Sequence, residues 1–298
     1  MSVRVGLLGV PLDLGSNRRG TDMGPSAIRY ARLQEELEQI GLVVSDAGNV
    51  PTPVAECSPA GSVRVRYADA IARVAAEVDR EVSGLLEAEC LPVILGGDHS
   101  LSLGTVAAVA RRYPEVGILW MDAHADFNTP QTTPSGNVHG MVLACLAGCG
   151  DERLVWVGGF APKVRPERIA LVALRAVDPP EAALLREFGV TAFTMAEVDE
   201  RGIAAVMREA IRIAASGGAL HLSLDLDAVD PMYAPGVATP VAGGLSYREA
   251  HLAMELVAAS KALVSMEVVE VNPILDDHNR TGRLATELIA SALGKRIL

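Results

Sequence analysis

The sequence has few cysteines, and they are not spaced for a metal knuckle or a disulfide framework. Cys57, Cys90, Cys145 and Cys149 form no CxxC pair within the 298 residues. Neither a zinc-stabilised module nor a disulfide-rich secreted domain is therefore indicated. We expect the thiols to be small apolar core residues in a reducing cytoplasm.

Long hydrophobic runs are also absent, although 50% of the residues are hydrophobic and the mean hydropathy is +0.27. A membrane-spanning helix needs about 18 consecutive apolar residues, and no run approaches that length. The apolar stretch 5–10 is cut short by Pro11 and Asp13 and precedes no small-residue cleavage site, so we expect a first strand and not a signal peptide. The sequence predicts a cytoplasmic protein with no membrane partner.

Basic charge is scarce. The 26 Lys and Arg residues, of which three are lysines, face 37 Asp and Glu residues, and the net charge is −11. No basic stripe suited to nucleic acid is present, so we expect no nucleic-acid partner. An acidic surface suits a cationic small substrate, but it also serves solubility. The shortage of lysine is compatible with either a GC-rich genome or heat adaptation.

Short β-branched apolar runs alternate with longer amphipathic stretches along the whole chain, which is typical of repeated βαβ units. No linker, low-complexity tract or fixed-period repeat interrupts them. We predict an α/β fold: a single three-layer α/β/α domain over residues 1–298 with a mostly parallel central sheet of about eight strands. Strands are expected near 3–9, 42–46, 91–95, 116–121, 153–157, 169–174, 191–194, 219–225 and 262–269, and helices near 25–40, 63–89, 100–112, 138–148, 180–188, 196–216, 247–259 and 281–294.

The ligand site of such a sheet lies beyond the carboxyl ends of its strands. The strand at 91–95 is followed by the turn Gly96-Gly97-Asp98-His99-Ser100. Viewed alone, this turn has two interpretations: Asp98 or Ser100 caps a helix while His99 is a bystander, or His99 binds a ligand.

Two further strand ends carry aspartates. An extended chain after the strand at 116–121 would place Asp122, His124 and Asp126 on one face, and Asp225 and Asp227 follow the same alternation. Carboxylates on apolar strands are costly to bury without a counter-charge. We therefore predict that these residues bind cations.

The predicted donor set contains nitrogen and oxygen but no thiolate, and it has enough carboxylates to bridge two ions. It favours a pair of hard divalent ions such as manganese over structural zinc. Two such ions can share one water and lower its pKa towards neutrality, which indicates a hydrolase. The predicted ligands are His99, Asp122, His124, Asp126, Asp225 and Asp227.

Five motifs occur in the order found in the arginase family of ureohydrolases, and the chain resembles that family over nearly its whole length. The segment 19–29 also resembles the family's first loop and helix start. The motifs are GGDHS at 96–100, DAHADFN at 122–128, SGNVHG at 135–140, SLDLDAVDP at 223–231 and VEVNP at 269–273.

The resemblance implies two Mn2+ per subunit, with Asp122 and Asp225 as bridging ligands. One ion would be held by His99, Asp122, Asp126 and Asp225, and the other by Asp122, His124, Asp225 and Asp227. It also implies a homo-oligomer, either a trimer or a hexamer.

The resemblance further implies that a metal-bridging hydroxide attacks the guanidinium carbon of L-arginine and yields L-ornithine and urea. Glu270 would pair with the guanidinium, since a carboxylate and a fork of N–H donors form a bidentate pair. Asp126 would relay the proton to the leaving amine, and His139 would act as proton shuttle.

Recognition of the amino-acid end is implied in the same way. Asp178 matches a residue that contacts the α-ammonium, and Thr239 matches a contact on the guanidinium side. Ala176 replaces a second acidic residue that is usual in the family. The residues expected to bind the α-carboxylate are Asn128, Ser135 and Asn137.

Three alternatives remain open. The chain could be an agmatinase or another guanidino-compound hydrolase, a catalytically silent member of the fold, or a deacetylase or phosphoesterase with a similar metal cradle. The other histidines have structural interpretations: we expect His221 in the core or behind the metal site, His251 in an amphipathic helix and His278 exposed.

Overall fold

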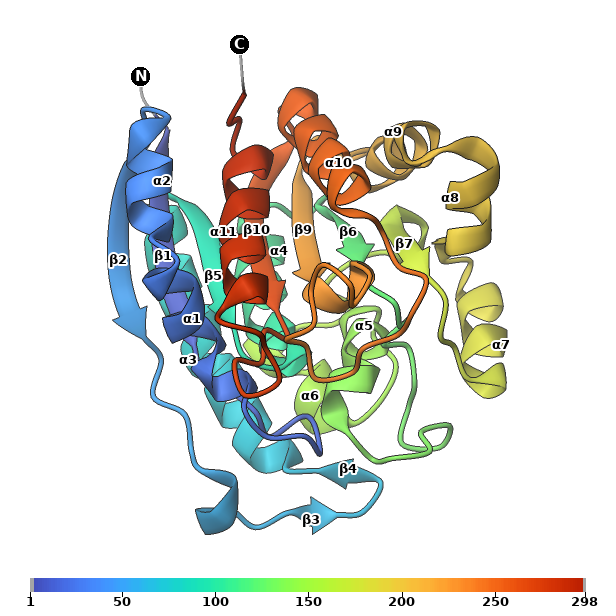
Figure 1. The fold of residues 1–298 in the computed structure, drawn as a ribbon. Helices are drawn as coiled ribbons and strands as arrows, with labels where there is room; N and C mark the ends of the chain where they lie inside the picture. The colour runs from blue at the N-terminus through green and yellow to red at the C-terminus, as the bar shows by residue number, and fades with distance from the viewer. Residues whose placement is uncertain (1–2, 297–298) are drawn as a thin grey trace.

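The computed structural model describes residues 3–296 and is built around one sheet of eight parallel strands (Figure 1). The strand order across the sheet is β2-β1-β5-β10-β9-β6-β7-β8. The strands are β1 Arg4–Val10, β2 Val43–Asn49, β5 Leu91–Gly96, β6 Gly117–Met121, β7 Ile169–Leu174, β8 Thr191–Thr194, β9 Leu220–Asp225 and β10 Leu263–Val269.

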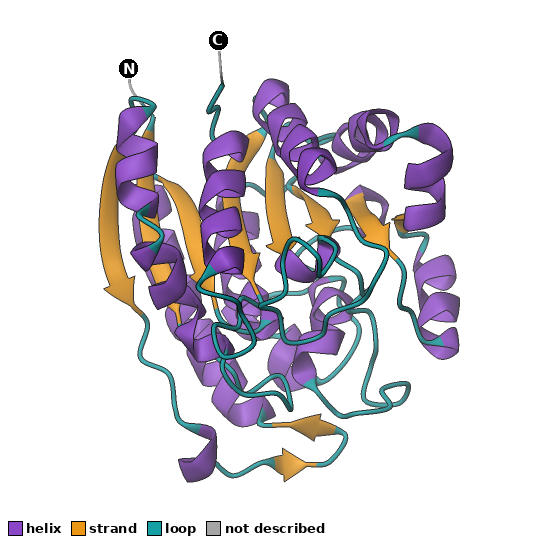
Figure 2. Ribbon diagram, viewed as in Figure 1, coloured by secondary structure: helices purple, strands orange, loops and turns teal. Residues whose placement is uncertain are grey.

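Helices cover both faces of the sheet, as Figure 2 shows. Helices α3, α4 and α5 pack on one face, and α1, α2, α9, α10 and α11 pack on the other. The predicted α/β/α fold with about eight strands is confirmed. The helices are α1 Gly24–Tyr30, α2 Leu33–Gln39, α3 Ala68–Glu87, α4 Ser102–Arg112, α5 Val142–Leu146, α6 Glu152–Val155, α7 Pro179–Phe188, α8 Met195–Arg201, α9 Ile203–Ala214, α10 Tyr247–Ser260 and α11 Arg280–Ala292.

Alternation along each central strand explains why both faces are covered. Ile94 and Trp120 point into the core shared with α3 and α4, whereas Val93 and Leu119 point into the core shared with α9 to α11. All four side chains are fully buried. A parallel sheet buried on both faces needs such continuous apolar strands, which leaves polar residues to gather where the strands end.

The strand expected at 153–157 is wrong. Asp151 accepts a hydrogen bond from Arg153 N and so caps the short helix α6, and a 3-10 turn follows at Val157–Gly159. The apolar residues of this segment bury as a helix because the cap precedes them. Two expected helices are also each split in two, one at Arg32 (φ 65°) and one at Gly202 (φ 77°).

A two-stranded antiparallel hairpin, β3 Gly61–Ser62 and β4 Val65–Arg66, precedes α3 and was not predicted. The helix expected from residue 63 therefore begins at Ala68. Figure 1 shows the hairpin on the side of the molecule to which the strand arrowheads point. Within residues 3–296, no helix combines the length and the apolar character needed to cross a membrane.

Candidate metal centre and substrate cavity

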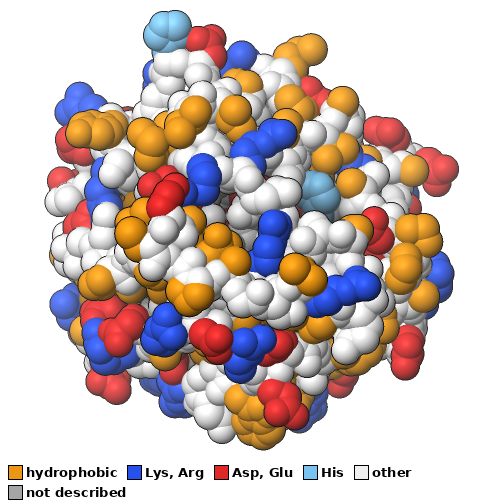
Figure 3. All heavy atoms as spheres, turned by 90° about the horizontal axis from the view of Figure 1, so that it is seen from below, with side chains coloured by type: hydrophobic (Ala, Val, Ile, Leu, Met, Phe, Trp, Pro, Cys, Tyr) orange, Lys and Arg blue, Asp and Glu red, His pale blue; other side chains and the backbone are white. Residues whose placement is uncertain are grey.

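The predicted ligands come together because they follow neighbouring strands. Strands β5, β10, β9 and β6 are adjacent and parallel, so their carboxyl ends meet at one edge of the sheet. His99 follows β5, Asp122 follows β6, and Asp225 ends β9. Seen from this side in Figure 3, basic and acidic side chains are interspersed over the surface.

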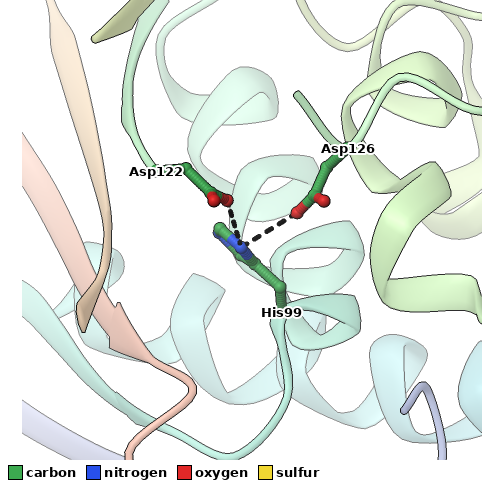
Figure 4. Close-up of side chains that lie close together, drawn as sticks. All are labelled: His99, Asp122 and Asp126. Carbon is green, nitrogen blue, oxygen red and sulfur yellow. Dashed lines mark ion pairs between the residues drawn. The ribbon is translucent and has the colours of Figure 1, made fainter. Parts of the chain in front are cut away.

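The first cluster surrounds His99, as Figure 4 shows for two of its carboxylates. The His99 Nδ1 atom lies 3.1 Å from Asp126 Oδ2, 3.3 Å from Asp122 Oδ2 and 3.4 Å from Asp225 Oδ2. All four residues are buried. The His99 ring is stacked on Trp120 at 4.0 Å between centroids, and its Nε2 lies 2.7 Å from Ser223 Oγ, so its orientation is fixed from behind.

The second cluster surrounds His124 and shares Asp122 with the first. His124 Nδ1 lies 3.0 Å from Asp227 Oδ2 and 3.4 Å from Asp122 Oδ1. The two oxygens of Asp122 therefore face different clusters, as a bridging ligand requires. Asp225 directs Oδ2 to the first cluster, while its Oδ1 accepts a hydrogen bond of 2.7 Å from Asp227 N.

The electrostatics of the two clusters fit cations. Burial raises the pKa of Asp225 and of Asp227, and nearby carboxylates, Asp122 among them, raise both further. His99 Nδ1 is buried and has no hydrogen-bond partner among the described residues, although three carboxylates surround it. A divalent ion would accept the lone pair of His99 Nδ1, and the charge of the bound ions would offset the repulsion between the carboxylates. With nitrogen and oxygen donors only, the residues fit a pair of hard cations.

The backbone that brings these residues together differs from the expected extended chain. Strand β6 ends at Met121, and Asp126 lies in the left-handed region at φ 50°. Residues Leu226–Ala228 form a 3-10 turn that Asp225 caps. The alternation argument was therefore wrong about the conformation beyond the strands. Hydrogen bonds from backbone N–H groups to Asp122 and Asp225 shape both turns instead.

Glu270 and His139 lie beside the first cluster. Glu270 follows β10 at φ 65°, and its Oε1 accepts a hydrogen bond from His99 N at 2.9 Å and lies 3.0 Å from His139 Nδ1. Burial opposes protonation of His139, but Glu270 together with Asp126 and Asp98 raises the pKa of His139 to about 9. The second oxygen of Glu270 is buried without a partner in the part of the chain that is described.

A cavity of about 240 Å3 opens beside both clusters. One wall is acidic and carries Asp126, Asp178, Glu181 and Asp225. A second wall, formed by the loop 128–137, carries neutral polar groups. The residues predicted for substrate that line the cavity are Asn128, Ser135, Asn137, Asp178 and Thr239.

Individual contacts refine these predictions. Asn128 Nδ2 donates to Asp178 Oδ2 at 3.1 Å, so one of its two N–H groups is already engaged. Thr239 Oγ1 donates to Asp227 Oδ2 at 3.0 Å and thus touches a candidate ligand directly. Ala176 also lines the cavity.

Glu181 was not predicted from the sequence. It lines the cavity and its carboxylate binds the two chain segments at Phe127 and Asp178. Its carboxylate accepts hydrogen bonds from Phe127 N at 2.8 Å and Asp178 N at 3.2 Å. Burial, with a contribution from Asp126, raises the pKa of Glu181 to about 7. A signal was present: Asp178 and Glu181 have the spacing of a capping box at the start of α7.

A buried polar network behind the first cluster was only partly expected. Ser223 Oγ donates to Glu267 Oε1 at 2.8 Å, and His221 Nε2 lies 3.3 Å from the same oxygen. His221 therefore lies behind the metal site, as predicted, while Glu267 was missed. His251 packs on α11 through Ser291.

Two smaller expectations can also be judged. His278 is exposed and lies beside Asp277, as predicted. Cys90 and Cys145 are buried, but Cys57 is exposed and Cys149 is partly exposed, so the core interpretation is wrong for those two.

Comparisons with known proteins agree with this geometry. The model of the arginase family matches residues 3–294. The arginase of Bacillus caldovelox is 45% identical over 296 residues, which cover 99% of each chain. A solved structure of arginase from Bacillus caldovelox has a TM-score of 0.97 and covers 100% of both chains. A hypothetical agmatinase from Burkholderia thailandensis is less similar, with a TM-score of 0.74, 26% identity, and coverage of 98% of this chain and 85% of that one.

The agreement extends over nearly the whole chain and is not confined to the strand ends. The family model, the curated relative and the solved structure each match this chain over almost all of its length. The chain belongs to the arginase family.

Proposed function

We propose that this protein is an arginase that hydrolyses L-arginine to L-ornithine and urea. The observation that carries the proposal is the pair of His/Asp clusters that share Asp122 and lie beside a cavity. The much higher identity to an arginase than to an agmatinase supports arginine as the substrate.

We infer that the two cations are Mn2+, because carboxylate and imidazole donors without thiolate suit hard divalent ions. When bound, such a pair lowers the pKa of a shared water towards neutrality and so supplies hydroxide. The residues that would hold the ions are His99, Asp122, His124, Asp126, Asp225 and Asp227.

Glu270 would orient the guanidinium. Its Oε1 is occupied by His99 N–H and His139, whereas no described residue donates to its buried Oε2. A free carboxylate oxygen at this place can accept an N–H of the substrate and fix the position of the guanidinium carbon.

Asp126 would move the proton that the reaction requires. In the ion-free protein, burial and the charge of Asp122 raise its pKa to about 6. With cations bound, its carboxylate would accept a proton and pass it to the leaving nitrogen. Hydrolysis adds a hydroxyl group to the guanidinium carbon and breaks the bond from this carbon to Nε of arginine. The hydroxyl proton moves to that nitrogen as the carbonyl of urea forms. His139, whose side chain is 14% exposed, would exchange protons between the site and solvent.

The neutral wall would receive the α-carboxylate through Asn128, Ser135 and Asn137. The acidic wall would receive the α-ammonium through Asp178, with Glu181 beside it. Opposite charges at the amino-acid end of the substrate would thus be matched by different walls.

We further propose that residues 1–298 form one ureohydrolase domain, that the protein acts in the cytoplasm, and that it assembles as a homotrimer or homohexamer. Light scattering of the purified protein distinguishes these assemblies from a monomer.

The test is a chelated sample reloaded with manganese and supplied with L-arginine or agmatine at equal concentration. We expect urea from arginine, two manganese ions per chain and clearly slower turnover of agmatine. Preference for agmatine would reassign the substrate. A fully reloaded sample without urea from either compound would identify a silent member of the fold.

A further inference from the structure

The charge around the cavity poses a problem for a substrate with an α-carboxylate. Asp178 and Glu181 line it together with the candidate ligands Asp126 and Asp225, whose charge bound cations would offset, and Glu270 lies close behind. This concentration of carboxylates attracts guanidinium and ammonium groups but repels a carboxylate. The residues proposed to bind the anion, Asn128, Ser135 and Asn137, are neutral amide and hydroxyl donors.

The loop that forms the neutral wall is hydrogen-bonded to the β3–β4 hairpin. Arg66 N donates to Gly136 O at 2.9 Å, and Arg64 Nη1 donates to Thr133 O at 3.2 Å. Gly136 has φ 73°, and a Cβ atom there would lie 1.9 Å from the carbonyl oxygen of Val63. The approach is so close that only glycine fits at residue 136.

Arg66 also reaches a side chain of the cavity wall. Its Nη2 donates to Asn137 Oδ1, which turns the oxygen of the amide towards the hairpin. None of residues 3–296 accepts a hydrogen bond from Asn137 Nδ2. Asn137 is 8% exposed and lines the cavity, so its amide has N–H donors left for a ligand.

Arg66 is distinctive in charge as well as in position. Within residues 3–296, the side-chain cations hydrogen-bonded to lining residues are Arg64 and Arg66. Arg64 is exposed and binds a backbone carbonyl, whereas Arg66 is partly buried and binds the Asn137 side chain. A partly buried cation is screened less by solvent than an exposed one.

We propose that Arg66 is a positioning residue that makes the enzyme select guanidines carrying a carboxylate beside the amine. It holds Asn137 with the N–H donors available and places a positive charge behind them. The inference rests on the proposed function. It names a residue that makes the enzyme bind arginine in preference to its decarboxylated analogue agmatine.

The test compares Arg66→Met, Arg66→Lys and Arg64→Met with the wild-type holoenzyme. Arginine and agmatine differ by the α-carboxylate, and so do the products ornithine and putrescine. We expect Arg66→Met to raise the KM for arginine about tenfold with little change in kcat, and to leave kcat/KM for agmatine within about twofold. Arg66→Lys should recover part of the loss, because it retains the charge.

Equilibrium binding of ornithine and putrescine to the same proteins provides a readout that needs no turnover. Arg66→Met should weaken ornithine about tenfold and leave putrescine unchanged, while Arg64→Met should affect both ligands alike. If Arg66→Met lowers the affinity for ornithine and for putrescine equally, or changes neither affinity, Arg66 merely supports the loop and the inference is overturned. A wild-type protein that releases no urea from arginine would instead overturn the proposed function, and the ornithine to putrescine ratio would still judge Arg66.

Discussion

The two walls of the cavity are built in different ways. The wall with the candidate ligands stands at the ends of central strands. Its carboxylates Asp122, Asp225 and Asp227 are buried and accept hydrogen bonds from backbone N–H groups. The neutral wall is a loop, 128–137, held by its own side chains and by the hairpin. The first arrangement gives the rigidity that chemistry needs, and the second leaves substrate choice to a segment that can vary without disturbing the sheet.

The largest effect should come from the residue that joins the two clusters. We expect Asp122→Ala to lose both ions and at least about 1,000-fold in urea release, because the variant removes an oxygen from each cluster and leaves the other carboxylates uncompensated. Metal analysis after gel filtration and a urea assay measure this. Asp199→Ala, which removes an exposed carboxylate on helix α8, is the matched control. Retention of one ion at full occupancy would show that the clusters bind independently.

A smaller loss should separate metal binding from substrate orientation within the strand-built wall. We expect Glu270→Gln to retain both ions but to lower kcat/KM for arginine about 100-fold or more, since the amide keeps an acceptor for His99 N but loses the charge that faces the guanidinium. The assay is steady-state urea release alongside metal content. Near wild-type turnover with normal metal content would remove Glu270 from the site.

The strand-built wall was also the part that could be predicted. Apolar runs that end in Asp122 or Asp225 indicate both a strand and a cost of burial, and this local signal was sufficient to predict cations. The left-handed conformation of Asp126 could not be foreseen, because it depends on the packing of the turn and not on the preference of aspartate. Roles such as that of Glu270 came from the resemblance to a family.

The loop-built wall could be predicted only in part. Asn137 was expected at the cavity, but its partner Arg66 is 71 residues away in a hairpin whose strands are two residues each. Such short strands carry no periodic pattern. Glu181 was missed for another reason: its capping-box spacing has a complete explanation in helix α7, which conceals its second contact with Phe127 N.

A change in the loop should leave the strand-built wall intact. We expect Gly136→Ala to raise the KM for arginine about tenfold, because a Cβ would push the loop off the hairpin, while kcat and the content of both ions stay close to wild type. Gly84→Ala is the control, since a Cβ on this helix residue meets nothing within 4 Å. If the variant also loses metal, the two walls are mechanically coupled and the distinction between them fails.

The smallest effect concerns Glu181, which lines the cavity and accepts hydrogen bonds from Phe127 N and Asp178 N. Burial raises its pKa from 4.5 to about 7, so the folded protein binds a proton more tightly than the unfolded chain does between these values. This contribution to stability is present below pH 4.5 and is lost as the pH rises through about 7.

The variant Glu181→Gln has no carboxyl group at residue 181 to titrate. The unfolding free energy of the metal-free wild type should therefore fall by about 2 kcal/mol relative to Glu181→Gln between pH 5 and pH 8. Urea denaturation of both proteins at the two pH values measures this difference. If the unfolding free energies of the wild type and Glu181→Gln change equally between the two pH values, the pKa of Glu181 is not raised. Glu181 would then already be largely ionised at pH 5 and add a negative charge to the cavity.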